Sequence, residues 1–432
     1  MRPLRPYSIS TRSSESLRQS LQQKHTEKPS HAIWLTSVGI FLPYTVGVTG
    51  KYVIAPLFLL AAVRFFTAVS RGSRGIVTCD LFVWAMALWM MAAEVTVTGS
   101  LSLTTGSDAF GFVGAYTLAR AYIFGERPLR TFVRALKIVT VTLVALSTLD
   151  TLSGHFFIND AVAAMFFGAP PLITKGAGDI HRVLFGINTI RATSTFPHPI
   201  LYGTFCSLAA AIFLYSERRL AWRAFYVGAC FMGCVLSISS APLMAFLIIV
   251  LVYGYDKILW RYPSRWKAFW MIVFGSVFTL FLLSNRPLGF LFDHFTFTPE
   301  TGYYRILIWQ NALSYIAIAP FTGDHSAWLL DEILSNSVDS VWLTLSLSFG
   351  LPVALFLLLA SLTACRVGPG GKRTSLDFEV QRLRTAFSLV IAMFVFLGLT
   401  VHFWASIWLF WGLCIGIRAS IQEYSLHERR ND

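Results

Sequence analysis

Charged residues are scarce in this sequence, and their scarcity excludes a water-soluble globular protein. Only 13% of the 432 residues are Asp, Glu, Lys or Arg, whereas soluble domains carry roughly 25%. The mean hydropathy is +0.61. About twelve apolar runs recur along the chain, most of them long enough to cross a hydrocarbon core as a helix. The sequence therefore predicts an all-α integral membrane protein with about 12 transmembrane helices.

The chain also lacks the motifs of many nucleotide- and metal-dependent enzymes. It has no phosphate-binding Walker loop, no HExxH pair, no nucleophile elbow and no cluster of metal ligands. The six cysteines lie in or beside apolar runs without zinc or redox spacing, which indicates packing residues. We therefore expect no cofactor and a metal-independent chemistry.

The apolar runs also define a topology. They predict helices at approximately 32–49, 52–70, 76–97, 106–124, 134–152, 198–215, 222–239, 242–256, 267–284, 340–363, 385–401 and 404–421. The net charge of +13 comes from Lys and Arg clusters between these runs, which is typical of cytoplasmic loops and not of nucleic-acid binding. We expect a disordered cytoplasmic tail at 1–31, a membrane domain at 32–421 and a second cytoplasmic tail at 422–432.

Two loops on the opposite, outer side are long, at about 153–197 and 286–339. They are rich in aromatic and aliphatic residues, and long loops of this kind are often functional. Neither contains an Asp-x-Asp pair. Six basic residues lie on the outer side, against the usual charge bias: Lys51, Lys175, Arg182, Arg191, Arg286 and Arg305. All of them except Lys51 lie in the two long loops. Each arginine either pairs with a local carboxylate or contributes to an anion site, because guanidinium binds phosphate as a fork.

Candidate site residues follow from these loops. Arg305 and Trp309 are four residues apart in a helical pattern, which suits either a sugar-phosphate site or an interfacial helix. Asp339 precedes the run at 340–363, where it is either a general base or the helix N-cap. His198 lies between two prolines at the outer interface, and His325 follows Asp324 in the second loop. For both histidines the alternatives are a structural and a functional role.

Three segments together resemble the O-antigen ligase and polymerase superfamily, which includes WaaL-like ligases and Wzy-type polymerases. RATSTFPHPILYGTF (191–205) resembles the family's Arg…Phe…His-Pro…Gly segment. TGYYRILIWQNALSYIAIAPFTGDH (301–325) resembles its Arg-x-x-x-Trp helix, and SVDSVWLTLSLSFGLPVALFLLL (337–359) resembles the segment that returns to the membrane. With loop placement, the resemblance covers most of residues 180–420.

The resemblance implies a GT-C-like glycosyltransferase in a bacterial inner membrane, with its active site on the periplasmic face. The donor would be a glycan on undecaprenyl pyrophosphate, and another lipid-linked glycan would be the acceptor. Chain-length regulator and export proteins are further implied partners. The resemblance places Asp339, Arg305 and Arg191 in catalysis. It places the substrate contacts on a larger set: His198, Trp309, His325, Arg182, Arg286 and Tyr304.

Two departures from the family pattern affect the choice of reaction. Ligases carry His-Asn where this chain has Asp339 and Ser340, which favours a polymerase of exopolysaccharide or surface polysaccharide. The family's Ser-Arg is replaced by Ser239 and Ser240, so the family's third cationic contact has no match there, and Arg182 and Arg286 are the candidates to replace it. A ligase that transfers glycan to lipid A core, a flippase or transporter for lipid-linked sugars, and a structural partner in a secretion assembly are the alternatives.

Overall fold

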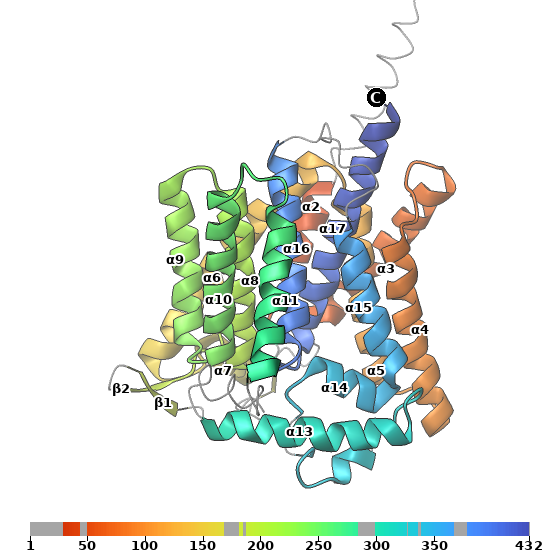
Figure 1. The fold of residues 1–432 in the computed structure, drawn as a ribbon, viewed down its shortest axis with the longest axis vertical. Helices are drawn as coiled ribbons and strands as arrows, with labels where there is room; N and C mark the ends of the chain where they lie inside the picture. Colours follow the sequence, from red (N-terminus) through yellow and green to blue (C-terminus); the bar gives the residue numbers. More distant parts are fainter. Residues whose placement is uncertain are drawn as a thin grey trace, which may run out of the picture.

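The computed structural model describes residues 29–43, 50–167, 181–184, 187–283, 299–325, 327–335, 338–366 and 378–431, and these residues are mainly helical (Figure 1). The elements, in chain order, are α2 (Pro29–Gly39), α3 (Gly50–Ser70), α4 (Thr78–Thr98), α5 (Leu103–Tyr122), α6 (Glu126–Ser153), α7 (Phe157–Phe167), β1 (His181–Leu184), β2 (Ile187–Ile190), α8 (Pro199–Ser216), α9 (Leu220–Leu236), α10 (Ser240–Ile258), α11 (Arg265–Leu283), α13 (Pro299–Ile318), η2 (Ala327–Leu330), α14 (Val341–Phe349), α15 (Leu351–Cys365), α16 (Phe378–Leu397) and α17 (Ala405–Asn431).

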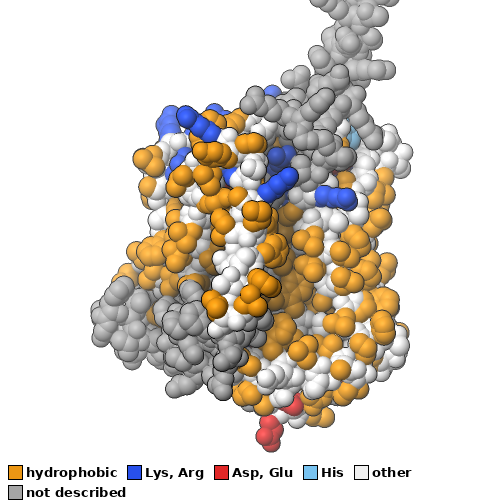
Figure 2. Space-filling model, viewed as in Figure 1, with side chains coloured by type: hydrophobic (Ala, Val, Ile, Leu, Met, Phe, Trp, Pro, Cys, Tyr) orange, Lys and Arg blue, Asp and Glu red, His pale blue; other side chains and the backbone are white. Residues whose placement is uncertain are grey.

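The architecture is that of a predominantly helical, multi-pass membrane protein. Within the described ranges, six helices are long and apolar enough to cross a membrane: α4, α6, α8, α10, α16 and residues Ala405–His427 of α17. Residues Ile54–Ser70 of α3, together with α9 and α15, are shorter apolar helices. Figure 2 shows apolar side chains over the flank of the bundle and Lys and Arg side chains gathered at its upper end. The total of about 12 spans remains a prediction.

The centre of the bundle is formed by α8 and α17, whose side chains are almost all buried. Helix α17 packs closely on α5 because Gly412 and Gly416 carry no side chain at the crossing. A Cβ at Gly416 would lie 2.4 Å from the carbonyl oxygen of Tyr116, and one at Gly412 would lie 2.7 Å from that of Phe112. The close packing brings the polar residues of α5 and α17 into contact at one end.

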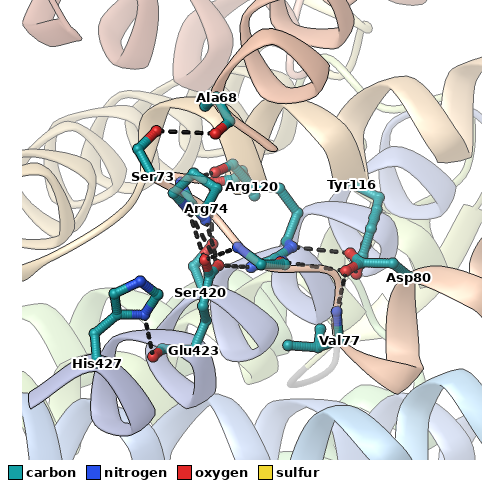
Figure 3. A network of polar contacts seen from close by, with 12 residues as sticks. Ala68, Ser73, Arg74, Val77, Asp80, Tyr116, Arg120, Ser420, Glu423 and His427 are labelled. Carbon is teal, nitrogen blue, oxygen red and sulfur yellow. Dashed lines mark hydrogen bonds and ion pairs between the residues drawn. The ribbon is translucent and has the colours of Figure 1, made fainter. Parts of the chain in front are cut away.

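A buried ion-pair network joins α4, α5 and α17 (Figure 3). Arg120 Nε lies 2.9 Å from Asp80 Oδ1, and Arg120 Nη1 lies 2.7 Å from Glu423 Oε2. Arg74, from the turn before α4, lies 2.8 Å from the same Glu423 oxygen. The phenol of Tyr116 donates to Asp80 at 2.5 Å. Two cations therefore face two carboxylates, so the buried charges balance.

The outer-loop segments lie at the opposite end from the C-terminus. Helix α13 runs across the lower end of the bundle in Figure 1, with α14 beside it. A small core of Ile308, Ala312, Leu334 and Leu343 joins α13 to the chain that follows it. This arrangement places Arg305, on α13, over the ends of the bundle helices.

Three features depart from the sequence-based expectations. The run at 340–363 is divided into α14 and α15 at Gly350, where φ is +82° and a Cβ would lie 2.1 Å from the carbonyl oxygen of Phe321. The first long loop contains an antiparallel hairpin, β1–β2, which the expectation of an all-helical chain omitted. Helix α17 continues to Asn431 through the predicted tail at 422–432. Residues 1–28 of the predicted N-terminal tail lie outside the described residues.

Candidate functional site

The segment Arg191–His198 is held in place by two polar side chains of the preceding helices. Asp150, near the end of α6, accepts hydrogen bonds from the backbone nitrogens of Thr193 at 3.2 Å and Ser194 at 2.8 Å. Asn159 on α7 donates to the carbonyl oxygen of Ser194 at 2.9 Å. Ser194 has a φ of 54°, an unfavourable region for a non-glycine residue, and these contacts stabilise it there. The segment is therefore a rigid support for the residues at its ends.

Arg191 is buried, with 7% of its surface exposed, and its guanidinium is oriented by the turn between α9 and α10. Its Nη2 donates to Ser239 Oγ at 2.6 Å, and its Nε donates to the carbonyl oxygen of Ser237 at 3.3 Å. The backbone nitrogen of Ala192 donates to the carbonyl oxygen of Leu236 at 3.0 Å, which joins the same two segments. Ser239, which stands where the family pattern expects Ser-Arg, is thus a contact of Arg191.

His198 is the N-cap residue of α8, and its Nδ1 accepts a hydrogen bond from the backbone nitrogen of Ile200 at 3.2 Å. The prolines on either side fix the backbone that makes this possible. Burial and, to a lesser extent, the charge of Arg191 lower the pKa of His198 to about 4, and Asp339 opposes the shift. The imidazole is therefore neutral at pH 7. With Nδ1 as acceptor, Nε2 is assigned the proton.

Asp339 is the common neighbour of the charged groups at this end of the bundle. Its carboxylate acts electrostatically on Arg305, on His198 and on His402. The N-cap of α14 is Ser340, not Asp339: Ser340 Oγ accepts from the backbone nitrogen of Leu343 and donates to the carbonyl oxygen of Gly398 at 2.9 Å. Of the two sequence-based interpretations of Asp339, helix capping is wrong, because the neighbouring serine does it.

Arg305 lies on α13, and the predicted helix around Arg305 and Trp309 is confirmed. Its Nε is buried and has no hydrogen-bond partner in the part of the chain that the structure describes. Burial lowers the pKa of Arg305, and Asp339 opposes that shift. The guanidinium still carries its charge, since arginine does not deprotonate in proteins. A buried cation with an unused donor is suited to binding an anion.

His402 and Trp404 belong to the same end of the bundle, and the sequence-based predictions included neither. They lie between α16 and α17, with their rings stacked at 5.4 Å and an interplanar angle of 22°. The ring of His198 lies 5.9 Å from that of Trp404. Burial lowers the pKa of His402 to about 4, while Asp108 and Asp339 oppose the shift. The only signal in the sequence was a histidine at the junction of two apolar runs.

The structure thus brings together Arg191, His198, Arg305 and Asp339, with His402 as an additional member. We call these five residues the Asp339 cluster. They come from four segments that are far apart in the sequence, and they combine two fixed cations, one carboxylate and two imidazoles with lowered pKa values. Such a set can bind an anionic group and accept a proton beside it.

Other predicted site residues have structural contacts elsewhere. His325 Nε2 lies 3.1 Å from Glu94 Oε1, a contact that joins the second loop to α4. The phenol of Tyr304 donates to the carbonyl oxygen of Ile333 at 3.0 Å, and Trp309 packs in the same small core. None of these contacts involves a member of the Asp339 cluster, so the part of these three residues in substrate binding stays a prediction.

Two further predictions fall where side chains are not described. Arg182 lies on β1, and its side-chain position is not described. Arg286 lies outside the described residues. Their roles in substrate binding therefore also stay predictions.

Fold and site together define the class of this chain as a multi-pass helical membrane protein with a charged cluster at one end. No family model matches the chain, and no curated protein matches it.

Proposed function

We propose that the chain is a membrane glycosyltransferase that polymerises oligosaccharide repeat units carried on undecaprenyl pyrophosphate. One observation supports this above the others: all three segments that resemble the ligase and polymerase superfamily contribute residues to the Asp339 cluster. The first segment contributes Arg191 and His198, the second Arg305 and the third Asp339. A structural partner in an assembly needs no such convergence of buried charges from distant segments. Buried charged residues destabilise a membrane helix bundle, so their presence in one cluster favours a functional role.

The proposed reaction transfers one glycan to a second lipid-linked glycan. A hydroxyl oxygen of the acceptor forms a bond with the anomeric carbon of the donor, and the bond from that carbon to the pyrophosphate oxygen breaks. The bonding pair leaves with the pyrophosphate, and the hydroxyl proton passes to the protein. No oxidant, reductant or activated nucleotide is consumed.

Four of the five members of the cluster have roles that their surroundings suit. Arg305, whose buried Nε has no partner among the described residues, binds the pyrophosphate and stabilises the charge that develops on it. Arg191 adds a second cation whose orientation Ser239 and Ser237 hold. Asp339 accepts the proton of the attacking hydroxyl, because its carboxylate lies within electrostatic reach of Arg305 and His198. His198, neutral at pH 7, donates a hydrogen bond from Nε2 without adding charge.

The cellular setting belongs to the same proposal. The Lys and Arg side chains at the upper end of the bundle favour that end as cytoplasmic, which puts the Asp339 cluster on the periplasmic face of a bacterial inner membrane (Figure 2). Substrates then reach the cluster after their lipid carrier has been moved across the membrane. Chain-length regulator and export proteins are proposed partners on that face.

Replacing Arg305 by Ala in the native cell tests the proposal. We expect single repeat units on polyprenyl pyrophosphate to accumulate and long polymer to disappear, as measured by mass spectrometry of lipid extracts. Arg261→Ala, which removes an exposed arginine at the other end of the bundle, is the matched control and leaves the profile unchanged. Accumulation of long lipid-linked chains in R305A would instead identify a ligase. An unchanged profile at equal membrane expression would refute the role of Arg305.

A further inference from the structure

Two arginines converge on one carbonyl group at the basic end of the bundle. Arg223 on α9 donates to the carbonyl oxygen of Glu217 from Nε at 3.0 Å and from Nη2 at 2.6 Å. Arg382 on α16 donates to the same oxygen from Nη2 at 3.1 Å. A carbonyl oxygen is neutral overall, so it orients the two guanidinium groups without neutralising them. Two like charges held this close repel each other unless an anion lies between them.

Two more cations lie around this pair. Lys257 Nζ lies 5.6 Å from the ring centre of Tyr253, and Arg223 Cζ lies 5.8 Å from the same ring centre. Lys257 is within electrostatic reach of both Arg223 and Arg382, and Arg218 is within reach of Arg382. We call Arg218, Arg223, Lys257 and Arg382 the basic cluster; it joins the ends of α9, α10 and α16.

The carboxylates nearest to the basic cluster are already engaged. Glu217 forms an ion pair with Lys137. Glu379 lies 2.9 Å from Arg130 and 3.6 Å from Arg218. Asp256 lies 2.6 Å from Arg265. Over the described part of the chain, neither Arg223 nor Arg382 has a carboxylate within ion-pair distance, so the cluster retains an excess of positive charge.

Unused polar atoms are a second and independent indication of a ligand. Arg382 Nε and the Tyr253 hydroxyl are both buried and have no hydrogen-bond partner among the residues that the structure describes. Buried donors are nearly always paired in folded proteins. Two unpaired donors beside an excess of positive charge match the oxygen atoms of a phosphate group.

The surface around the basic cluster is apolar, which distinguishes a lipid from a free ion. Leu220, Trp222 and Phe225 on α9 are 76%, 50% and 52% exposed, and the first turn of α9 holds Arg223 among them. Exposed aromatic and aliphatic side chains next to arginine are typical of a membrane interface. A ligand that reaches the cluster from this side has apolar chains as well as a phosphate.

We propose that the basic cluster is a binding site for the phosphate headgroup of an anionic phospholipid. Arg223 and Arg382 hold the phosphate, Lys257 and Arg218 add charge, and the acyl chains lie along the exposed apolar face of α9. Basic pockets between transmembrane helices bind anionic headgroups in this way. The site lies at the opposite end of the bundle from the Asp339 cluster and does not depend on the proposed reaction.

Native mass spectrometry of the purified full chain, incubated with phosphatidylglycerol or phosphatidylcholine, tests the site. Wild-type protein is expected to retain phosphatidylglycerol in preference to phosphatidylcholine. The double variant Arg223→Gln, Arg382→Gln is expected to lose about tenfold in phosphatidylglycerol affinity, since each interfacial cation contributes on the order of a several-fold effect. Lys257→Gln removes no hydrogen bond to the described residues and is expected to weaken binding several-fold. Arg71→Gln, which changes an exposed arginine in a loop, is the control.

The expected results distinguish a bound phospholipid from a free anion. Equal retention of the two phospholipids by wild-type protein would overturn the proposal. It would also be overturned if both K257Q and the double variant retained phosphatidylglycerol as well as the wild type does. Displacement of phosphatidylglycerol by millimolar inorganic phosphate would show a free-anion site and also overturn the assignment to a lipid. A loss confined to the cluster variants, with R71Q unchanged, supports the site.

Discussion

Asp150 on α6 accepts a hydrogen bond from the backbone nitrogen of Ser194 at 2.8 Å, and this contact connects a transmembrane helix to the candidate site. Ser194 lies midway between Arg191 and His198, in a backbone conformation that needs support. The same carboxylate also accepts from the backbone nitrogens of Thr193 and Phe157. One buried acid thus fixes the segment that carries two members of the Asp339 cluster.

Asp150→Ala is expected to lower the rate of polymer formation by roughly 100-fold, because the segment that positions Arg191 and His198 loses its anchor. The rate is measured with lipid-linked repeat units in purified membranes. Asp160→Asn, on the adjacent α7, is the control, since it changes an acid that makes none of these backbone contacts. Equal rates in D150A and wild-type protein would show that the segment is held without Asp150.

Ser239→Ala removes the acceptor that lies 2.6 Å from Arg191 Nη2. A hydrogen bond to a charged group contributes about 1.5–3 kcal/mol, so we expect at least a roughly tenfold fall in activity. The matched control is Ser240→Ala, which removes the neighbouring hydroxyl. Steady-state kinetics with purified protein distinguish the two variants. If S240A and S239A behave alike, the contact with Arg191 does not orient the cation.

The lowered pKa values of His198 and His402 predict a dependence of stability on pH. Both fall from 6.5 to about 4 on folding, so the unfolded chain binds more protons than the folded chain between these values. The contribution of these two histidines to stability is therefore constant above about pH 6.5 and decreases as the pH falls towards 4. The groups that face them are Arg191 and Asp339 for His198, and Asp108 and Asp339 for His402.

Thermal unfolding of wild-type protein and His402→Gln between pH 4.5 and 7.5 checks this dependence. The wild-type unfolding temperature is expected to fall more steeply with acid than that of H402Q, because only the wild type must charge this imidazole on unfolding. Other acids contribute equally to both proteins, so the difference between the two slopes isolates the histidine. Parallel slopes would contradict a buried, neutral His402.

Arg120→Ala tests the ion-pair network at the other end of the bundle. The substitution leaves Asp80 and part of the Glu423 charge buried without their cation, which costs about 3–5 kcal/mol in comparable buried pairs. We expect a sharp loss of folded protein in detergent, measured by size-exclusion chromatography and thermal unfolding. Arg127→Ala, an exposed arginine near the same end, is expected to leave both unchanged. A stable R120A protein would show that the network does not hold α5 to α17.

The sequence predicted the class of fold because hydropathy reports directly on burial in lipid. Every apolar run coincides at least in part with a helix, and the helical pattern around Arg305 is present as α13. The break at Gly350 was not predicted. It depends on the approach of Phe321, a residue that lies far away in the sequence and whose carbonyl leaves no room for a side chain. The short β1–β2 hairpin was also not predicted, because the loop that contains it was interpreted from its composition alone.

The members of the candidate site that the sequence predicted are those with an unusual residue type for their place in the chain. Arg191 and Arg305 were noticed because arginine is unusual in outer loops, and Asp339 because it precedes an apolar run. Asp150 was missed, since an acid at the end of a helix breaks no rule. His402 was missed because a lone histidine between two apolar runs carries no periodic signal. Tertiary packing brings these residues together, and their spacing along the chain does not indicate that packing.

The Asp339 cluster is proposed to join lipid-linked glycans. Purified protein in lipid nanodiscs, supplied only with a polyprenyl-pyrophosphate-linked repeat unit from the native cell, tests it most directly. We predict a ladder of products that each differ by one repeat unit, and a loss of at least roughly 100-fold in Asp339→Asn, where the proton acceptor is neutral. The absence of any ladder with wild-type protein, or an undiminished ladder with D339N, would contradict the claim.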